Sequence, residues 1–255
     1  MLRNLLFLMS IFSILTGCAS TVPPKHITTT DWNEATHQVV NQYSPATDRE
    51  LTPDFAKAKI SYPPKQVALL TFKKEEKMEL WAKDEKRPSW TYIKTYPLKA
   101  SSGTSGPKLK YHDGQIPEGV YKVVMLNPFS SWQLSMLINY PNDFDKQHAQ
   151  TDGRNDLGGD IYIHGKELSV GCLAIGDKAI DQLFVLAARV GPKNIKVIIA
   201  PNDLRKAKPI TNLKAQPKWV PELYATLEKE LTPFREDELD NIDSQKSGGL
   251  FSFLT

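Results

Sequence analysis

The chain has 255 residues, of which 40% are hydrophobic and 24% charged, and its formal net charge at neutral pH is +3. Basic and acidic residues are interspersed along the sequence, so the basic blocks typical of nucleic-acid binding are missing. A chain of this size and hydrophobic content is long enough for one sizeable domain with extensions. Composition therefore predicts a folded protein with no nucleic-acid partner.

The first residues have the pattern of an export signal. Arg3 is followed by an apolar run over residues 5–15, which is too short to span a bilayer and typical of a secretory signal peptide. The run ends at Leu15-Thr16-Gly17-Cys18, which resembles the bacterial lipobox, whose cysteine receives a diacylglycerol and becomes the mature N-terminus. We expect a lipoprotein signal peptide over residues 1–17 and lipidation of Cys18. An ordinary signal peptide that happens to contain a cysteine is the alternative.

The residue after the expected anchor bears on location. An aspartate there would resemble the inner-membrane retention signal of bacteria with two membranes, but this chain has Ala19. Because acyl chains hold a protein stably on a membrane, the rest of the chain can stay in the aqueous phase. We expect a periplasmic protein that is attached through its lipid to the outer membrane.

Polar and turn-forming residues dominate the next segment. Residues 18–64 are rich in Thr and Pro, and they read as a lipid-anchored tether with one short helix from Asp31 to Tyr43. From residue 65 to 200 short apolar or alternating runs follow one another, which predicts strands. The expected strands are Gln66–Phe72, Met78–Ala82, Trp90–Tyr96, Val120–Leu126, Trp132–Asn139, Asp160–Ile163 and Asn194–Ala200.

Two segments have helical periodicity instead. Residues 177–189 place Ile180, Leu183 and Phe184 on one stripe, with Asp177 as the expected N-cap. Residues 219–231 form a second amphipathic pattern within a C-terminal extension, over residues 201–255, that ends in a flexible tail. The predicted fold class is α+β, mostly β with helices.

The second cysteine lies close to a histidine. Cys18 is expected to carry lipid, so Cys172 has no partner for a disulfide and should remain free. A thiol is a useful nucleophile only as the thiolate, which needs a neighbouring base at neutral pH. His164 lies eight residues earlier, at the end of an expected strand, and glycines between them allow a tight turn. We therefore predict Cys172 as a nucleophile and His164 as its general base.

Backbone N–H groups near the cysteine are candidates for stabilising an oxyanion. Those of Gly171 and Cys172 can point at the oxygen of an attacked carbonyl, and Ser169 can bind substrate or position the loop. Spacing alone leaves two alternatives open, a buried structural cysteine and a zinc pair. We predict neither metal nor organic cofactor, because thiol and backbone donors supply the chemistry.

Several segments carry a resemblance to a known family. His164-Gly165 followed by Ser169-Val170-Gly171-Cys172 resembles the catalytic signature of the L,D-transpeptidases, which act on peptidoglycan stem peptides. The stretches 106–108, 114–121 with its Pro-Glu-Gly-x-Tyr turn, 134–142 and 157–165 resemble the murein branch with a short loop between histidine and cysteine. The resemblance covers roughly residues 65–200 and implies a β-sandwich-like catalytic domain over that range.

What the resemblance implies is acyl transfer through a cysteine thioester, with diaminopimelate-containing stem peptides as substrate and an amine or an outer-membrane lipoprotein as acceptor. Gly165, Asn139 and Tyr140 are further candidate substrate contacts, and Arg154 is a candidate to pair with a stem-peptide carboxylate. The alternatives are an exposed loop arginine at 154 and a packing role for Tyr140. Many members follow the cysteine with a hydrophobic residue and then Arg or Asn, whereas Leu173-Ala174 follows here. Without that Arg or Asn, the substrate contacts should differ from those of other members, whereas the nucleophile is the same.

Three readings of the function remain. The first is a transpeptidase, and the second is a hydrolase of the same thioester chemistry that releases peptidoglycan-linked lipoprotein or cleaves cross-links. The third is a lipid-anchored protein that binds the wall without turnover. The sequence does not decide the acceptor, the oligomeric state or the need for an activator.

Overall fold

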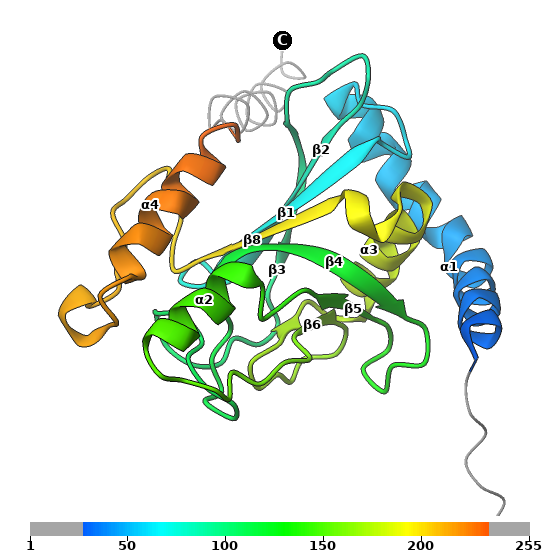
Figure 1. The fold of residues 1–255 in the computed structure, drawn as a ribbon. Helices are drawn as coiled ribbons and strands as arrows, with labels where there is room; N and C mark the ends of the chain where they lie inside the picture. The colour runs from blue at the N-terminus through cyan, green and yellow to red at the C-terminus, as the bar shows by residue number, and fades with distance from the viewer. Residues whose placement is uncertain (1–27, 235–255) are drawn as a thin grey trace, which may run out of the picture.

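The computed structural model describes residues 28–234, and its centre is one mixed sheet of eight strands (Figure 1). The strand order is β3-β2-β1-β8-β4-β5-β6-β7. The strands are β1 (Gln66–Phe72), β2 (Lys77–Lys83), β3 (Thr91–Pro97), β4 (Gly119–Asn127), β5 (Ser135–Ile138), β6 (Tyr162–His164), β7 (Leu173–Ala174) and β8 (Ile195–Ala200). The helices are α1 (Thr29–Ala58), α2 (Asp143–Thr151), α3 (Asp177–Val190) and α4 (Val220–Leu231). The predicted α+β class is confirmed.

Strand β1 shows why the sheet is covered on both faces. Val67 and Leu69 belong to the larger core cluster, which includes the apolar residues of α1 and α3, whereas Ala68, Leu70 and Phe72 belong to the cluster beneath α4. Successive side chains of a strand point to opposite faces, so a continuous apolar run needs cover on both sides. Figure 1 shows α1 and α3 together at one side and α4 at the other.

Helix α1 differs from the tether that the sequence predicts. It runs for 30 residues, much longer than the expected helix from Asp31 to Tyr43, and it buries Thr47, Leu51 and Phe55 against α3 and β3. Arg189 of α3 bonds to the carboxylate of Asp48, which ties the two helices together. The prediction of a tether is therefore wrong for residues 29–64. The polar composition of this segment suggested a tether because α1 buries only a narrow apolar stripe, and so few apolar residues leave its mean hydropathy low.

Several element bounds also differ from prediction. The strand expected over Trp132–Asn139 is confined to β5, because Trp132 to Leu134 form a turn before it. Helix α2 was not predicted, since Ala149 alone is buried on it, although Asn142 and Asp145 form a capping box at its start. Within residues 28–234 no helix combines the length and the apolarity that a bilayer crossing needs. The signal peptide, Cys18 and the expected tail lie outside the described residues.

As far as residue 234, the C-terminal extension is part of the folded body. Helix α4 packs Leu223, Leu227 and Leu231 on the second face of the sheet, and Phe234 lies edge-on to Trp81 of β2, with ring centroids 5.4 Å apart. The hydroxyl of Tyr224 donates to Glu118, the residue just before β4. The predicted helix over residues 219–231 is thus present, and it completes the core rather than extending from it.

Candidate active site

The parallel pairing of β6 and β7 places Cys172 and His164 on one face of the sheet. Ile163 pairs with Leu173 and His164 with Ala174, so Cys172, directly before β7, falls opposite Tyr162. Because side chains alternate along a strand, Tyr162, His164 and Cys172 share a face. The backbone N–H of Tyr162 lies 3.4 Å from the Cys172 sulfur, in agreement with that register. Two residues eight apart in sequence thus lie on one face through strand pairing, and the Cys172 thiol donates to the Asp160 carbonyl at 3.8 Å.

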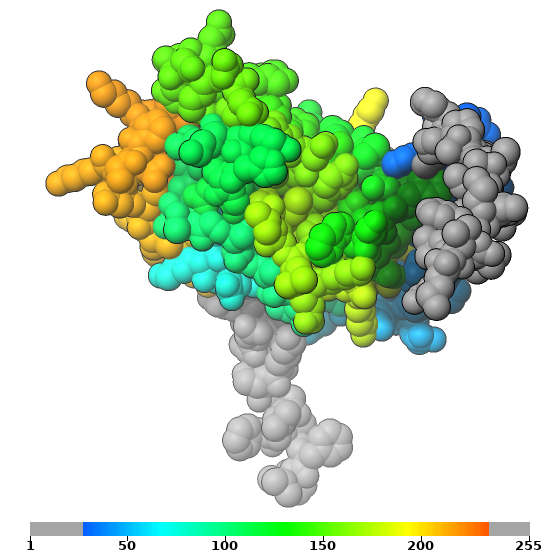
Figure 2. Space-filling view, turned by 90° about the horizontal axis from the view of Figure 1, so that it is seen from below, coloured from blue at the N-terminus to red at the C-terminus, as the bar shows by residue number. Residues whose placement is uncertain are grey.

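Both side chains line one groove, of about 710 Å³. Its walls come from the β4–β5 loop, β6 and the loop of residues 165–171, which we call the catalytic loop. The lining residues are Asn127, Phe129, Ser130, Ser131, Trp132, Ser135, Tyr162, His164, Leu168, Ser169, Val170 and Cys172, and none of them is Lys, Arg, Asp or Glu. Figure 2 views the molecule from the side of β5 and β6, where green and yellow-green segments from the middle of the chain fill the centre of the surface.

The hydrogen bonding of His164 fixes which ring nitrogen can act as a base. Its Nδ1 lies 2.6 Å from the carbonyl oxygen of Gly165, and because a carbonyl only accepts, Nδ1 carries the hydrogen. The other nitrogen, Nε2, is then unprotonated in the neutral ring. The ring is almost fully buried and packs on Trp132, with centroids 5.1 Å apart. Strand pairing and this hydrogen bond therefore orient an imidazole in the tautomer that accepts a proton.

Burial keeps both reacting groups neutral in the resting protein. Burial lowers the pKa of His164 below its usual 6.5, against the opposing effect of the Gly165 hydrogen bond. Burial raises the pKa of the Cys172 thiol, while the N–H of Tyr162 acts in the opposite direction. The resting pair is thus a thiol and a neutral imidazole.

Serine hydroxyls hold the predicted oxyanion donors. The N–H of Cys172 donates to the Oγ of Ser169 at 3.1 Å, and that hydroxyl donates back to the Cys172 carbonyl at 2.7 Å. The N–H of Gly171 donates to the Oγ of Ser102 at 2.7 Å. The φ of Gly171 is +87°, a left-handed conformation that glycine adopts without strain, so the chain turns sharply into the cysteine. Sequence reasoning missed Ser102, which lies 69 residues before Gly171.

Packing explains the glycine at position 165. A Cβ there would lie 2.6 Å from the carboxylate of Asp177 and 2.8 Å from the carbonyl oxygen of Trp132. Its N–H donates to that same carbonyl of Trp132 at 3.0 Å. Gly165 therefore lets the catalytic loop pass close to the β4–β5 loop. It is not among the residues that line the groove.

Asp177 also differs from its predicted role. The N-cap of α3 is Gly176, and the Asp177 carboxylate accepts the backbone N–H of Lys166 at 2.7 Å. This bond connects the start of α3 to the catalytic loop. Asp177 correctly indicated where the helix begins. Its carboxylate, however, bonds to Lys166 of the catalytic loop rather than to a backbone N–H in the first turn of α3.

Helix α1 supports one wall of the groove. The indole N–H of Trp32 donates to the carbonyl of Leu126 at 2.7 Å, and its ring meets Phe129 edge-on, with centroids 5.3 Å apart. Further along α1, the hydroxyl of Tyr43 accepts from the Nε2 of Gln133 at 2.9 Å. The β4–β5 loop, which carries Phe129 and Trp132, is thus held at both ends by a helix that the sequence placed in a tether.

Three predicted substrate contacts do not line the groove. The guanidinium of Arg154 bonds to Asp152 through two nitrogens and to the Leu109 carbonyl through the third. The Oδ1 of Asn139 accepts the N–H of Lys122 at 2.7 Å. Tyr140 is buried, and its hydroxyl donates to the Leu157 carbonyl. Each polar group is already bonded within the protein, so these residues shape the surroundings of the site.

Metal ligation has little support in the described part of the chain. Across residues 28–234 no group of three or more His, Cys, Asp and Glu side chains is arranged to hold a metal ion. Cys172 is a free cysteine of intermediate exposure. Its chemistry is therefore argued from the thiol itself.

Comparisons with known proteins agree with this geometry. The YkuD family model, described as the L,D-transpeptidase catalytic domain, matches residues 67–199, more than half of the chain. A curated relative, the putative L,D-transpeptidase YafK of Escherichia coli K12, is 31% identical over 140 residues, which cover 53% of this chain and 54% of that protein. The chain thus spans about half the length of the curated relatives it matches.

Two solved structures align with part of the chain. The helical cell shape determining protein Pgp2 of Campylobacter jejuni aligns over 54% of this chain and 48% of its own, with 21% identity and a TM-score of 0.44. Bd1075 of Bdellovibrio bacteriovorus aligns over 68% of this chain and 57% of its own, with 18% identity and a TM-score of 0.40. On the match to the family model, over the residues that carry β1 to β8 and the groove, the chain belongs to the L,D-transpeptidase catalytic domain family.

Proposed function

We propose that this protein is a cysteine-dependent L,D-transpeptidase that acts on peptidoglycan stem peptides. The observation that carries the proposal is the shared groove of Cys172 and His164, with the Nδ1 hydrogen of His164 directed to the Gly165 carbonyl. Membership of the family supports peptidoglycan as the substrate class. Attachment through Cys18 to the outer membrane, facing the periplasm, belongs to the same proposal.

In the first half-reaction, the Nε2 of His164 takes the proton from the Cys172 sulfur. The thiolate attacks the carbonyl carbon at the L-centre of the diaminopimelyl residue, and a carbon–sulfur bond forms. The carbon–nitrogen bond to the following residue then breaks, and the leaving amine takes the proton from His164. The product is a thioester on Cys172.

In the second half-reaction, an acceptor amine attacks the thioester and gives its extra proton to His164. The new carbon–nitrogen bond forms, the carbon–sulfur bond breaks, and the sulfur regains its proton. A water molecule in place of the amine gives a carboxylic acid, which is the hydrolase reading of the same machinery. The acceptor, an amine or water, decides between the two outcomes.

The serine-held N–H groups define what oxyanion binding requires. For Gly171 and Cys172 to donate to the developing oxyanion, their bonds to Ser102 and Ser169 must be exchanged for bonds to substrate. A hydroxyl is a neutral acceptor, and an oxyanion accepts about twice as strongly. The exchange therefore favours the transition state over the resting protein.

The test is to incubate the full chain in detergent with defined tetrapeptide muropeptides and, separately, with lipoprotein-linked peptidoglycan, and to identify products by mass. Cross-linked or amine-exchanged products support the transpeptidase. Products that gain only water support the hydrolase. If muropeptides bind but no product and no thioester on residue 172 form, the wall-binding reading replaces the proposal.

A further inference from the structure

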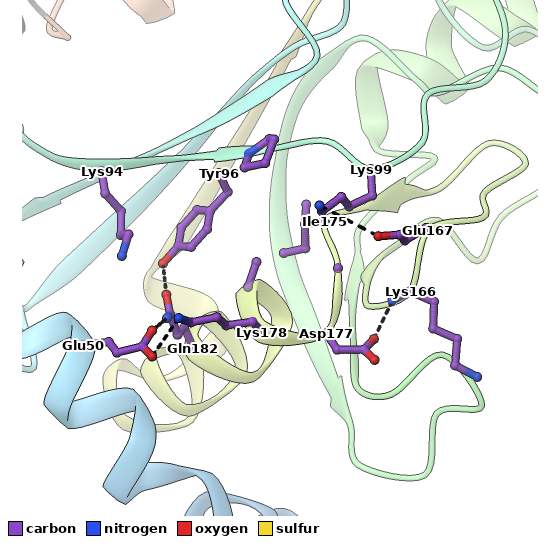
Figure 3. A pocket seen from close by; sticks show the side chains of 13 residues that line it. Glu50, Lys94, Tyr96, Lys99, Lys166, Glu167, Ile175, Asp177, Lys178 and Gln182 are labelled. Atoms are coloured by element: carbon purple, nitrogen blue, oxygen red, sulfur yellow. Dashed lines mark hydrogen bonds and ion pairs between the residues drawn. The ribbon is translucent and has the colours of Figure 1, made fainter.

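A second hollow, of about 670 Å³, lies on the other side of the catalytic loop from Cys172. It is bounded by α1, the end of β3, the first turns of α3 and residues 166–167 (Figure 3). We call it the α1–α3 pocket. Leu168, Ser169 and Val170 of the same loop line the catalytic groove, so the loop separates the two cavities.

Both ends of the α1–α3 pocket carry an ammonium and a carboxylate. At the α1 end, the Nζ of Lys178 lies 2.8 Å from Glu50, with Lys94 beside them in Figure 3. At the catalytic-loop end, the Nζ of Lys99 lies 3.8 Å from Glu167. Each end therefore offers a positive and a negative group to a molecule that enters the pocket.

Between the charged ends the pocket has an apolar floor. Ile175 and Ala179 line it and are almost completely buried, and Pro97 adds a further apolar surface. The hydroxyl of Tyr96 donates to the side-chain oxygen of Gln182 at 2.9 Å, so this phenol presents its ring rather than its polar group. A ligand that fits this lining is charged at both ends and aliphatic in the middle.

The ion pairs at the two ends can be broken with little loss of free energy. Lys178 and Glu50 have side chains that are 76% and 32% exposed, and Lys99 and Glu167 are 43% and 74% exposed. Exposed pairs of this kind contribute little to stability, because water screens them and their side chains are free to move. Glu50 also accepts a hydrogen bond from the Nε2 of Gln182. At each end, a zwitterionic ligand group can thus replace the lysine–glutamate ion pair with two ion pairs of its own, one to the lysine and one to the glutamate, with little loss of free energy.

We propose that the α1–α3 pocket binds a molecule with an amino–carboxylate group at each end of a short aliphatic chain. Free diaminopimelate has this chemistry, whereas in a stem peptide its L-centre end is held in amide bonds; its relevance to the wall rests on the proposed function. At each end the ligand carboxylate pairs with lysine and the ligand ammonium with glutamate. The aliphatic chain covers Ile175 and Ala179.

Occupancy of the pocket acts on the catalytic loop. Glu167 leaves Lys99 for the ligand, and its neighbour Lys166 is held by a backbone bond to Asp177 and by an Nζ bond to the Ser131 carbonyl. Lys166 has a φ of +57°, a left-handed backbone that its bonds maintain. Because Ser169 follows three residues later and bonds to Cys172, a shift of Glu167 is transmitted towards the nucleophile.

The experiment is titration calorimetry of the full chain in detergent with meso-diaminopimelate. We expect saturable binding at one site, and at least tenfold weaker binding of pimelate, which lacks ammonium groups, and of 1,5-diaminopentane, which lacks carboxylates. The double variant Glu50→Gln, Lys178→Gln should weaken diaminopimelate binding at least tenfold. Lys193→Gln, an exposed lysine outside the pocket, should leave the binding unchanged.

Three results overturn the inference. These are absence of binding, equal binding of pimelate, and binding that the double variant leaves intact. Loss of binding in Trp132→Ala, a groove variant, would place the ligand in the catalytic groove and overturn it as well. Muropeptide turnover measured in the same preparation separates the two proposals. If the enzyme is active but does not bind diaminopimelate, the proposal for the α1–α3 pocket fails and the proposed function stands.

Discussion

The catalytic groove and the α1–α3 pocket share the loop of residues 165–171 but differ in charge. The groove is lined by aromatic, aliphatic, serine and asparagine side chains and contains no charged one, whereas the pocket contains four lysines and three acidic residues. Lack of charge suits the groove, because burial keeps thiol and imidazole neutral until substrate arrives. Charged side chains suit the pocket, because the ligand proposed for it is zwitterionic. In these proposals one loop thus separates a groove for catalysis from a pocket for ligand binding.

Removal of the proposed nucleophile should have the largest effect, because it should abolish turnover in the groove and leave the α1–α3 pocket intact. We expect Cys172→Ala to lower turnover on the order of 10⁴-fold or more, because the thioester cannot form. Diaminopimelate binding should stay unchanged, since Cys172 does not line the α1–α3 pocket. Product masses and calorimetry on the same variant check both halves. Retained turnover would show that the chemistry lies elsewhere.

His164→Gln should have the next largest effect and a distinct dependence on pH. In the unaltered protein, activity should rise with pH along a limb below 6.5, since burial lowers the pKa of His164 and the base is neutral above that pKa. The variant should lose about 10²- to 10⁴-fold at neutral pH. Its rate should then follow the thiolate fraction and increase above pH 9, because the pKa of Cys172 is raised. A pH–rate profile checks this, and an unshifted limb contradicts the assignment of His164.

Trp32→Ala tests whether α1 holds the groove wall. Loss of the bond to Leu126 and of the Phe129 contact should cost about 1–3 kcal/mol of unfolding free energy. It should also lower kcat/KM about tenfold, since the β4–β5 loop loses its position. Denaturant unfolding and steady-state kinetics measure the two effects.

Trp90→Ala is the matched control for that variant. Trp90 stacks on Phe234, with centroids 5.1 Å apart, among residues that pack beneath α4 rather than at the groove. It should lower stability without changing kcat/KM. Equal kinetic effects in the two variants would mean that general loss of stability, and not the groove wall, is being measured.

Lys178→Gln should have the smallest effect. Its ion pair with Glu50 is exposed, so the free energy of unfolding should fall by less than about 1 kcal/mol. Diaminopimelate binding should weaken as well. Thermal unfolding measures the first of these. A large loss of stability would show that the pair belongs to the fold and is not available to a ligand.

Local sequence patterns predicted most of the strands and the two amphipathic helices. Val67 to Phe72 form an apolar run, and Ile180, Leu183 and Phe184 lie on one helical stripe, so periodicity alone indicated both elements. The sequence also pointed to Cys172 and His164 as a pair, and the structure places both in the lining of one groove, whereas their catalytic roles stay a prediction. The polar sequence of α1 concealed its role, since only Thr47, Leu51 and Phe55 are fully buried.

The sequence by itself determined which thiol and which imidazole are candidates for the chemistry, since sulfur and imidazole chemistry belongs to the residue types. It also determined the α+β class, because that follows from local periodicity. Tertiary structure alone decided that Ser102 holds the N–H of Gly171, that Trp32 supports the groove and that Arg154 is bonded elsewhere. These contacts join segments up to 94 residues apart, and their pairing depends on how the sheet and helices pack, which no local pattern records.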